Sequence, residues 1–302
     1  MATLAPPVPD AGRDPSPAAP TAHRRRRGGR RAGKPGPVTY TLLTLTTLVS
    51  IFPLYWTLVA GSHTNAEIAA TPPPFLPNAS LFDNFKLALE QAPIGKAILN
   101  SILVSGAITV GTVLFCTLAG FAFAKLAFRG KGVLLALVIG TMMVPTQLSV
   151  IPLFMMIAEL QWVNQLQAVI LPTLVSAFGV FFMRQYLISS LPNELLEAGR
   201  VDGASTFRIF WSIVVPVARP AMAVLAMLTF LTAWNEFFWP LIALTTANPT
   251  VQVALAGLGS GYVPQQSVIM AGTLLGTLPV LVVFTILGKQ IVGGIMQGAV
   301  KG

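Results

Sequence analysis

Long apolar stretches separated by short polar segments occupy most of this chain. A helix needs about 20 apolar residues to cross the hydrocarbon core of a bilayer, and six stretches meet that requirement. They cover residues 38–60, 97–124, 132–157, 167–188, 217–246 and 268–288. The pattern therefore predicts an all-α membrane protein with six transmembrane helices.

Two of the six stretches carry residues that interrupt a regular helix. Pro145 and Pro152 lie in the third stretch, and Pro240 lies in the fifth, where the polar Asn235 and Glu236 also fall. Proline lacks the backbone N–H that a helix interior requires. We therefore expect bends at these places, with neighbouring helices satisfying the freed backbone groups.

Residues 61–96 form a long loop after the first stretch. Thr71 and the three prolines that follow it are expected to be extended, because a proline disfavours helical geometry in the residue before it. Residues 83–90 are expected to form a short helix at the membrane interface.

The composition supports a membrane location and argues against several kinds of site. Charged residues make up 10% of the chain, against about 25% in soluble domains, and mean hydropathy is +0.73. The one cysteine, Cys116, cannot form an internal disulfide, and with only His23 and His63 beside it the sequence offers no metal cluster at ligand spacing. No nucleophile and base stand in a catalytic pattern, so no catalytic residue is predicted.

The distribution of positive charge orients the helices. Eight of the 19 Lys and Arg residues precede the first apolar stretch: Arg13, Arg24, Arg25, Arg26, Arg27, Arg30, Arg31 and Lys34. If the N-terminus is cytoplasmic and each stretch crosses once, only Lys86 and Lys96 fall outside. Since cytoplasmic loops are enriched in Lys and Arg, the sequence predicts cytoplasmic N- and C-termini.

Residues 1–37 are rich in Pro, Ala, Gly and Arg and are expected to form a disordered basic cytoplasmic tail. Such a tail can touch anionic lipid headgroups. No aromatic residue interleaves the arginines to stack on bases, so no nucleic acid partner is expected. The 38–60 stretch is longer than the apolar core of a signal peptide, about 7–15 residues, which favours an uncleaved first helix.

A phosphate-loop pattern in the tail is a coincidence of composition. Gly28 to Lys34 reads G-x-x-x-x-G-K, but Pro35 stands where a serine or threonine should bind magnesium, and no strand precedes the pattern. We therefore expect no ATP site and no cofactor in this chain.

The segment between the fourth and fifth stretches, residues 188–216, predicts a helix–turn–helix outside the membrane. Pro192 suits the first turn of a helix, and the two glutamates after it lie near the positive end of the helix dipole. Gly203 suits a left-handed position where that helix ends. A second short helix is expected from Thr206 to Val215.

An apolar stripe on the first of these helices needs a partner. Leu195, Ala198 and Val201 recur at helical spacing, and an exposed apolar face marks an interaction site. From spacing alone, two partners stay open. One is a groove on a soluble protein, of the kind that amphipathic helices fill, and the other is lipid at the membrane surface.

This segment resembles the EAA loop of ABC importer permeases, which reads Glu-Ala-Ala, then Gly, then an apolar run ending in Pro. Glu197-Ala198-Gly199, Gly203 and Ile213 to Pro216 match, with Gly199 in place of the usual alanine. In that family the loop holds the coupling helix, which docks into a cleft of the ATP-hydrolysing subunit. The resemblance therefore implies docking, and it gives the ATPase-coupling role to Glu197, Ala198, Gly199, Asp202, Gly203, Ile213 and Pro216.

The similarity runs from about Asn100 to the C-terminus and resembles the MalG-like subunit of the carbohydrate-uptake branch. Residues 234–237, residues 239–241 and the C-terminal ending carry it. It implies the type I ABC importer permease fold with a cytoplasmic coupling helix. The implied divisions are the first transmembrane helix and outer loop over 38–93, the ABC type-1 transmembrane domain over 94–290 and a C-terminal cytoplasmic tail over 291–302.

The C-terminal ending has a role of its own in MalG-like subunits, where it resembles an arm that reaches between the ATPase subunits. The resemblance gives this role to Gly298, Ala299, Val300, Lys301 and Gly302. A frayed, glycine-rich terminus is the alternative.

The resemblance also implies the partners of the chain. They are a second, MalF-like permease, a dimer of MalK-like ATP-binding subunits and an extracytoplasmic sugar-binding protein, all at the cell membrane of a prokaryote. ATP hydrolysis then belongs to a partner, and this chain is not an enzyme. An ion-coupled carrier is disfavoured, because Glu236 is the one acid within an apolar stretch and no internal repeat is evident. An ABC importer for amino acids or polyamines is the closer alternative.

The interrupted fifth stretch also suggests pathway residues, namely Trp234, Asn235, Glu236 and Trp239. A carboxylate in hydrocarbon costs about 2.5–3.5 kcal/mol, so Glu236 is expected to face the bundle interior, a water-filled cavity or the interface. The aromatic residues would then stack on sugar rings, or they would form an ordinary interfacial belt. In the sixth stretch Gly272 and Gly276 permit close helix approach, either within the subunit or across a permease pair.

Overall fold

The computed structural model describes residues 36–260 and 263–299, apart from the side chains of residues 287 and 289–299. These residues form helices and loops and contain no strand. Contacts divide the chain after Ser50. The part before this point holds the first half of α1 (Pro37–Gly61), whose side chains are exposed as far as Leu54. Everything below concerns the second part.

Four helices in the described residues are long and apolar enough to cross a membrane. They are α1, α4 (Ile94–Lys125), a continuous helix over Thr206–Asn235, and α14 (Gln266–Ala299) as far as Ile286. Two bent helix pairs also meet the criterion, one bent by 94° and the other by 41°. If each pair is one span, the total is six, which is the number that hydropathy predicts.

The sharper bend lies at Pro145. The helix α5 (Lys131–Thr141) ends four residues before it, and the 3₁₀ turn η1 (Thr146–Ser149) leads into α6 (Val150–Glu159). A proline ring clashes with the carbonyl four residues earlier, so α5 cannot continue through Pro145. The expected bend at Pro152 is absent, because this residue lies in the first turn of α6, where no intrahelical N–H donor is needed.

The second bent helix pair and the fifth apolar stretch are both interrupted at polar residues. The segment α7 (Gln167–Ile170) with η2 (Leu171–Thr173) leads to α8 (Ala177–Ser190), whose first turn is capped by the Ser176 hydroxyl. The helix α11 (Val215–Asn235) ends where the sequence predicts a break, and α12 (Phe238–Ala243) follows the extended Glu236.

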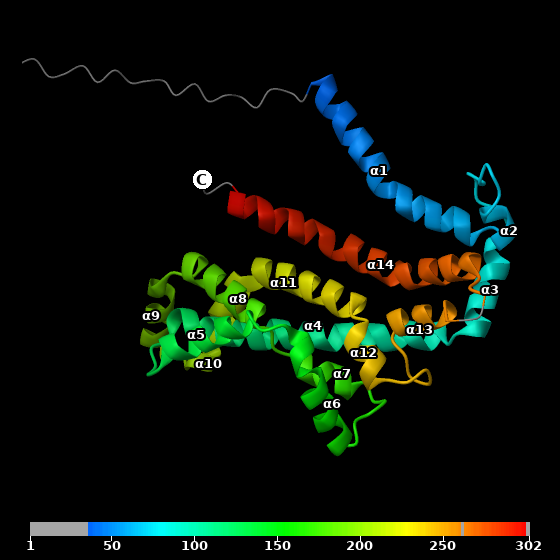
Figure 1. Ribbon diagram of the computed structural model, residues 1–302. Coiled ribbons are helices and arrows are strands. Elements are labelled where there is room, and N and C mark those ends of the chain that lie inside the picture. The colour runs from blue at the N-terminus through cyan, green and yellow to red at the C-terminus, as the bar shows by residue number, and fades with distance from the viewer. Residues whose placement is uncertain (1–35, 261–262, 300–302) are drawn as a thin grey trace, which may run out of the picture. The chain divides into compact units, whose positions relative to one another are not determined.

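Close approaches between helices rest on small residues. The helix α4 packs against α8, α11 and α13 (Val251–Leu258), and α14 packs against α11 and α3 (Leu81–Gln91), an arrangement visible in Figure 1. A Cβ atom at Gly120 would lie 2.9 Å from the backbone nitrogen of Arg184, so α4 and α8 meet backbone to backbone there. Cβ atoms at Gly272 and Gly276 would press on Leu258 and Val251 at 2.8 and 2.7 Å. Gly272 and Gly276, which form a GxxxG motif, therefore let α14 pack against α13 within the subunit.

The loop after α1 contains α2 (Asn65–Ile68) and α3, which confirms the short helix expected over residues 83–90. No helix forms between Thr71 and Pro74. The buried Asn84 of α3 donates to the carbonyls of Gly61 and His63, both at 2.9 Å. These bonds fasten α3 to the end of α1.

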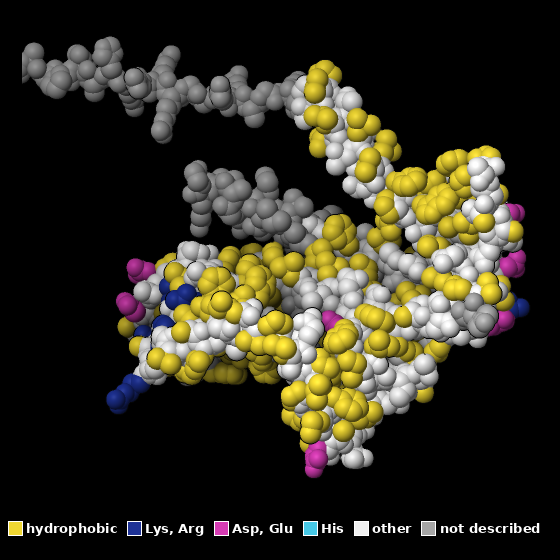
Figure 2. Space-filling view, in the orientation of Figure 1, with side chains coloured by type: hydrophobic (Ala, Val, Ile, Leu, Met, Phe, Trp, Pro, Cys, Tyr) yellow, Lys and Arg dark blue, Asp and Glu magenta, His cyan; other side chains and the backbone are white. Residues whose placement is uncertain are grey.

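The surface is largely apolar, as a lipid-facing surface must be. Figure 2 shows hydrophobic side chains over most of the visible face. Most of the Lys and Arg side chains visible in Figure 2 gather at the end formed by α9 (Asn193–Val201) and the start of α5. Basic side chains are thus concentrated at one end of the bundle, the pattern from which the sequence predicts orientation.

Candidate functional site

The helix–turn–helix between α8 and α11 forms as its sequence predicts. Pro192 stands at the N-cap of α9, in extended geometry with ψ 144°. Gly203 adopts φ +75°, the left-handed conformation that only glycine takes without strain. The Ser205 hydroxyl then accepts a hydrogen bond from the backbone N–H of Arg208 and caps α10 (Thr206–Ile209).

The second helix of the pair is longer than expected. A short helix ending near Val215 was predicted, but α10 passes through the π-helical turn η3 (Phe210–Val214) directly into α11. The result is one helix of 30 residues over Thr206–Asn235. Val215 and Pro216 directly follow the π-helical turn and have helical neighbours on both sides, so neither stops the helix. The segment outside the membrane and the membrane helix are therefore one continuous element.

The helix α9 has two apolar faces, one buried against the subunit and one exposed. Leu196 and Gly199 are buried on one face, and a Cβ at Gly199 would lie 3.2–3.3 Å from Ile213 and Ile209. Glycine at this position lets α9 pack closely against the start of the helix over Thr206–Asn235. The opposite face carries the predicted stripe.

We call Leu195, Ala198 and Val201 the docking face. All three are exposed, Val201 to 88% of its surface. The next helix adds two more exposed aromatic side chains, Phe207 and Trp211, whose ring centroids are 6.1 Å apart. Although these two rings contact each other, 69% of Phe207 and 47% of Trp211 stay exposed.

The residues that carry the EAA resemblance fall into two groups. Glu197, Ala198, Asp202, Gly203 and Pro216 are exposed, whereas Gly199 is buried and Ile213 is half-buried. The first group is available to a partner, and the second holds α9 in place. The anchor for α9 was not predicted: the Lys125 ammonium at the end of α4 donates to the Asn193 side chain at 3.0 Å.

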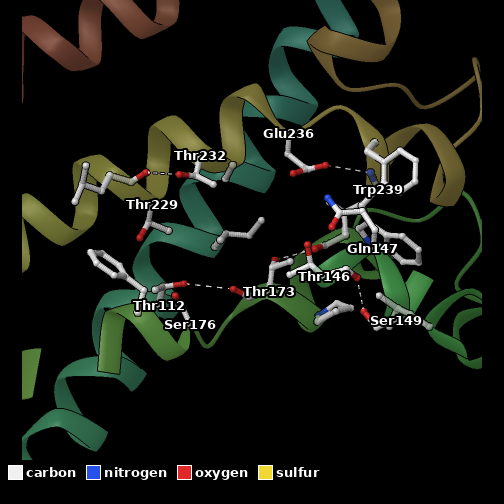
Figure 3. A pocket seen from close by; sticks show the side chains of 18 of the residues that line it. Thr112, Thr146, Gln147, Ser149, Thr173, Ser176, Thr229, Thr232, Glu236 and Trp239 are labelled. Carbon is white, nitrogen blue, oxygen red and sulfur yellow. Dashed lines mark hydrogen bonds between the residues drawn. The ribbon is translucent and has the colours of Figure 1, made fainter. Parts of the chain in front are cut away.

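A cavity lined by both apolar and polar residues lies at the end of α11. Its volume is about 570 Å³, within the range of small-molecule sites, about 300–1,000 Å³. Its polar lining comes from α4, η1, the α7–α8 connection and α11, as Figure 3 shows. These polar residues are Thr112, Thr146, Gln147, Ser149, Thr173, Ser176, Thr229, Thr232 and Glu236.

Only two of the four predicted pathway residues line this cavity, Glu236 and Trp239. Trp234 is buried and stacks on Phe230 at 5.7 Å, while the Asn235 amide donates to the Leu231 carbonyl of its own helix. Because Trp234 and Trp239 are 2% and 7% exposed, neither belongs to an interfacial aromatic belt.

Hydrogen bonds of Trp239 and Glu236 connect neighbouring segments of the cavity wall. The Trp239 indole N–H donates to the Ala168 carbonyl at 3.0 Å, and its backbone N–H donates to Glu236 Oε1 at 3.1 Å. The second bond satisfies a backbone N–H in the first turn of α12 and holds one carboxylate oxygen at the cavity edge (Figure 3). The cavity threonines were not predicted, since threonines in apolar helices commonly bond only their own backbone.

Comparison with known proteins identifies the family. A family model described as the binding-protein-dependent transport system inner membrane component matches residues 113–295. The chain belongs to this family. The chain is therefore a transport permease and a multi-pass membrane protein.

Individual permeases of the family resemble nearly the whole chain. The lactose transport system permease protein LacG of Rhizobium radiobacter is 34% identical over 88% of this chain and 97% of its own length. The arabinooligosaccharides permease AraQ of Bacillus subtilis is 32% identical over 84% and 92%. The sn-glycerol-3-phosphate permease UgpE of Salmonella typhi is 32% identical over 86% and 95%.

The fold is also that of a solved permease. A chain of a bacterial ABC transporter involved in the import of the acidic polysaccharide alginate matches with a TM-score of 0.73 and 22% identity, covering 83% of this chain and 94% of that one. The permease described here thus has the type I importer fold. Of its C-terminal ending, residues 300–302 lie outside the described residues, and residues 298–299 end α14 with no side chain described.

Proposed function

We propose that this permease is one membrane subunit of an ATP-driven importer that carries a sugar across the cytoplasmic membrane. The observation that carries the proposal is the exposed docking face on α9, packed through Gly199 on a helix that runs unbroken into the membrane. Such a face supports docking to a soluble subunit, and the continuous helix supplies a mechanical link. The resemblance of the chain to lactose, arabinooligosaccharide and glycerol-3-phosphate permeases supports a sugar or sugar derivative as cargo.

The proposed assembly contains a second permease, a pair of ATP-binding subunits and an extracytoplasmic sugar-binding protein. ATP is bound by the partner subunits, and this chain needs no cofactor. Closure of the ATPase pair moves α9, and α10 carries that movement into α11. The membrane helices then change between inward-facing and outward-facing states, each favoured by a different nucleotide state.

The proposed orientation places α9 and both termini in the cytoplasm. The gathering of basic side chains at the α9 end supports it, because positively charged loops stay on the cytoplasmic side. The exposed Lys86 and Lys96 belong to α3 and to the start of α4, next to the loop proposed to face outward.

Transport by the co-expressed complex in proteoliposomes tests the proposal. We expect ATP-dependent accumulation of labelled lactose or arabinooligosaccharide that survives collapse of the sodium and proton gradients. Val201→Glu is expected to release the ATP-binding subunits, whereas Leu76→Glu, a change at an equally exposed residue of the outer loop (76% exposed), leaves them bound. Gradient-driven uptake without ATP, or uptake of amino acids in place of sugars, would refute the proposed function.

A further inference from the structure

The relatives of this permease leave the charge of its cargo open. By name, LacG and AraQ serve uncharged saccharides, whereas UgpE serves a phosphate ester, and the transporter of similar fold serves an acidic polysaccharide. The cavity at the end of α11 contains polar groups that can decide between these classes. The inference that follows rests on the proposed function.

The cavity wall offers both hydrogen-bond acceptors and donors. The hydroxyls of Thr173 and Thr232 donate to carbonyls of their own helical turns at 2.9–3.0 Å, which leaves their oxygen lone pairs free to accept. Gln147 supplies an amide that both donates and accepts. Exposed rings of Phe178 and Phe238 add apolar surface between these groups. A wall that combines polar and apolar groups suits a sugar ring, which carries hydroxyls around its rim and C–H groups on its faces.

Glu236 is the one charged residue among the described residues that line the cavity, and none of them is Lys, Arg or His. Its Oε1 atom is held by the Trp239 backbone N–H, and no described residue donates to the other carboxylate oxygen. The side chain is half-buried and remains open to the cavity. The carboxylate is therefore fixed in place with one oxygen available to a ligand.

We propose that this cavity binds one ring of an uncharged saccharide, and that Glu236 determines its specificity by accepting sugar hydroxyls and repelling phosphates and carboxylates. A carboxylate accepts hydroxyl protons in short, charge-assisted hydrogen bonds. The same carboxylate opposes a ligand anion in a wall that carries no compensating cation. At an effective dielectric constant near 20, two like charges about 6 Å apart reduce affinity about 10- to 100-fold.

Direct ligand binding to the purified complex, without the binding protein, isolates the contribution of the membrane subunits. Lactose and arabinotriose serve as uncharged probes, and glycerol 3-phosphate and digalacturonate serve as anions, each titrated calorimetrically. We expect the wild-type complex to prefer the uncharged probes by at least about tenfold. Glu236→Gln keeps the side-chain length and the acceptor for Trp239, so we expect it to reduce this preference about tenfold while the complex stays assembled.

Glu159→Gln is the matched control, because it removes one exposed carboxylate at the end of α6, outside the cavity. We expect it to leave the preference unchanged. Equal binding of both classes by the wild type overturns the role of Glu236 even if the variant fails to fold, and so does an unchanged preference in folded Glu236→Gln. If the complex shows no ATP-dependent uptake of any sugar, the proposed function fails instead, whatever the order of the binding constants.

Discussion

Gly203 is the point at which the proposed coupling function can be tested most selectively. It adopts φ +75°, and a Cβ added there meets no atom within 4 Å. The cost of a substitution is therefore conformational and not steric. Holding an ordinary residue in the left-handed conformation costs about 1–2 kcal/mol, which lowers the population of the native turn by a factor of about 5–30. Asparagine tolerates this conformation far better than a β-branched residue does.

The expected result is a graded loss of coupling. The reconstituted complex imports a certain number of sugar molecules for each ATP hydrolysed. In Gly203→Val this ratio should fall, at most about 5- to 30-fold. Gly203→Asn should stay close to the wild type. Because α9 is linked to α10 through this turn, a displaced turn moves the docking face and leaves the membrane helices intact.

Gly130 provides the matched control for this measurement. It has φ +79° and equally open surroundings, but it is the N-cap of α5 and belongs neither to α9 nor to the turn that follows α9. Gly130→Val should cost similar backbone energy without changing the ratio of uptake to hydrolysis. A wild-type ratio in Gly203→Val, or equal losses at both glycines, would refute the proposed role of the turn.

Three further changes test packing and local electrostatics. Phe210→Ala removes a ring that is 2% exposed, and it should lower the free energy of unfolding by about 3–5 kcal/mol in detergent denaturation curves; a loss below 1 kcal/mol would contradict the packing. Gly120→Val should prevent the α4–α8 contact and abolish folded protein in gel filtration, whereas Gly95→Val, where a Cβ meets nothing within 4 Å, should not; equal yields would contradict the contact. Hydrogen bonds from the Thr64 backbone and hydroxyl lower the pKa of Glu67, so the α2 capping box is fully formed above the ordinary glutamate pKa and is lost only as pH falls through the lowered value. A carboxyl NMR titration at the ordinary value would contradict this.

Hydropathy predicts how many spans the chain has but not their paths. The six stretches were found because each contains enough apolar residues, a property that does not depend on direction. The 94° bend at Pro145 and the absence of a bend at Pro152 depend on where each proline falls within its helix, which becomes clear only once α6 is seen to begin at Val150. The π-helical turn before α11 has no comparable sequence signal, so the second coupling helix was predicted too short.

The two candidate sites were predictable to different degrees. The EAA resemblance assigns the coupling role to the segment between α8 and α11, and that role stays a prediction. Helical spacing identified Leu195, Ala198 and Val201 as a stripe, and the structure leaves all three exposed. Spacing alone did not show that Leu196 and Gly199 form a second apolar face, which the subunit buries for itself. In the cavity, Glu236 was evident as an acid in an apolar stretch, whereas the threonines around it were not, because they come from helices far apart in sequence.

Cross-linking at the docking face tests the coupling role most directly. The only cysteine of the chain, Cys116, is fully buried and needs no replacement. Val201→Cys places a reactive thiol on the docking face, and Leu76→Cys places one at an equally exposed position in the outer loop. In the assembled complex, a short thiol-to-amine cross-linker is expected to join Val201→Cys to the ATP-hydrolysing subunit in a nucleotide-dependent manner and to leave Leu76→Cys unjoined to it. Failure of Val201→Cys to reach that subunit, with labelling by lipid-soluble reagents instead, would show that α9 lies on the membrane and not on an ATPase.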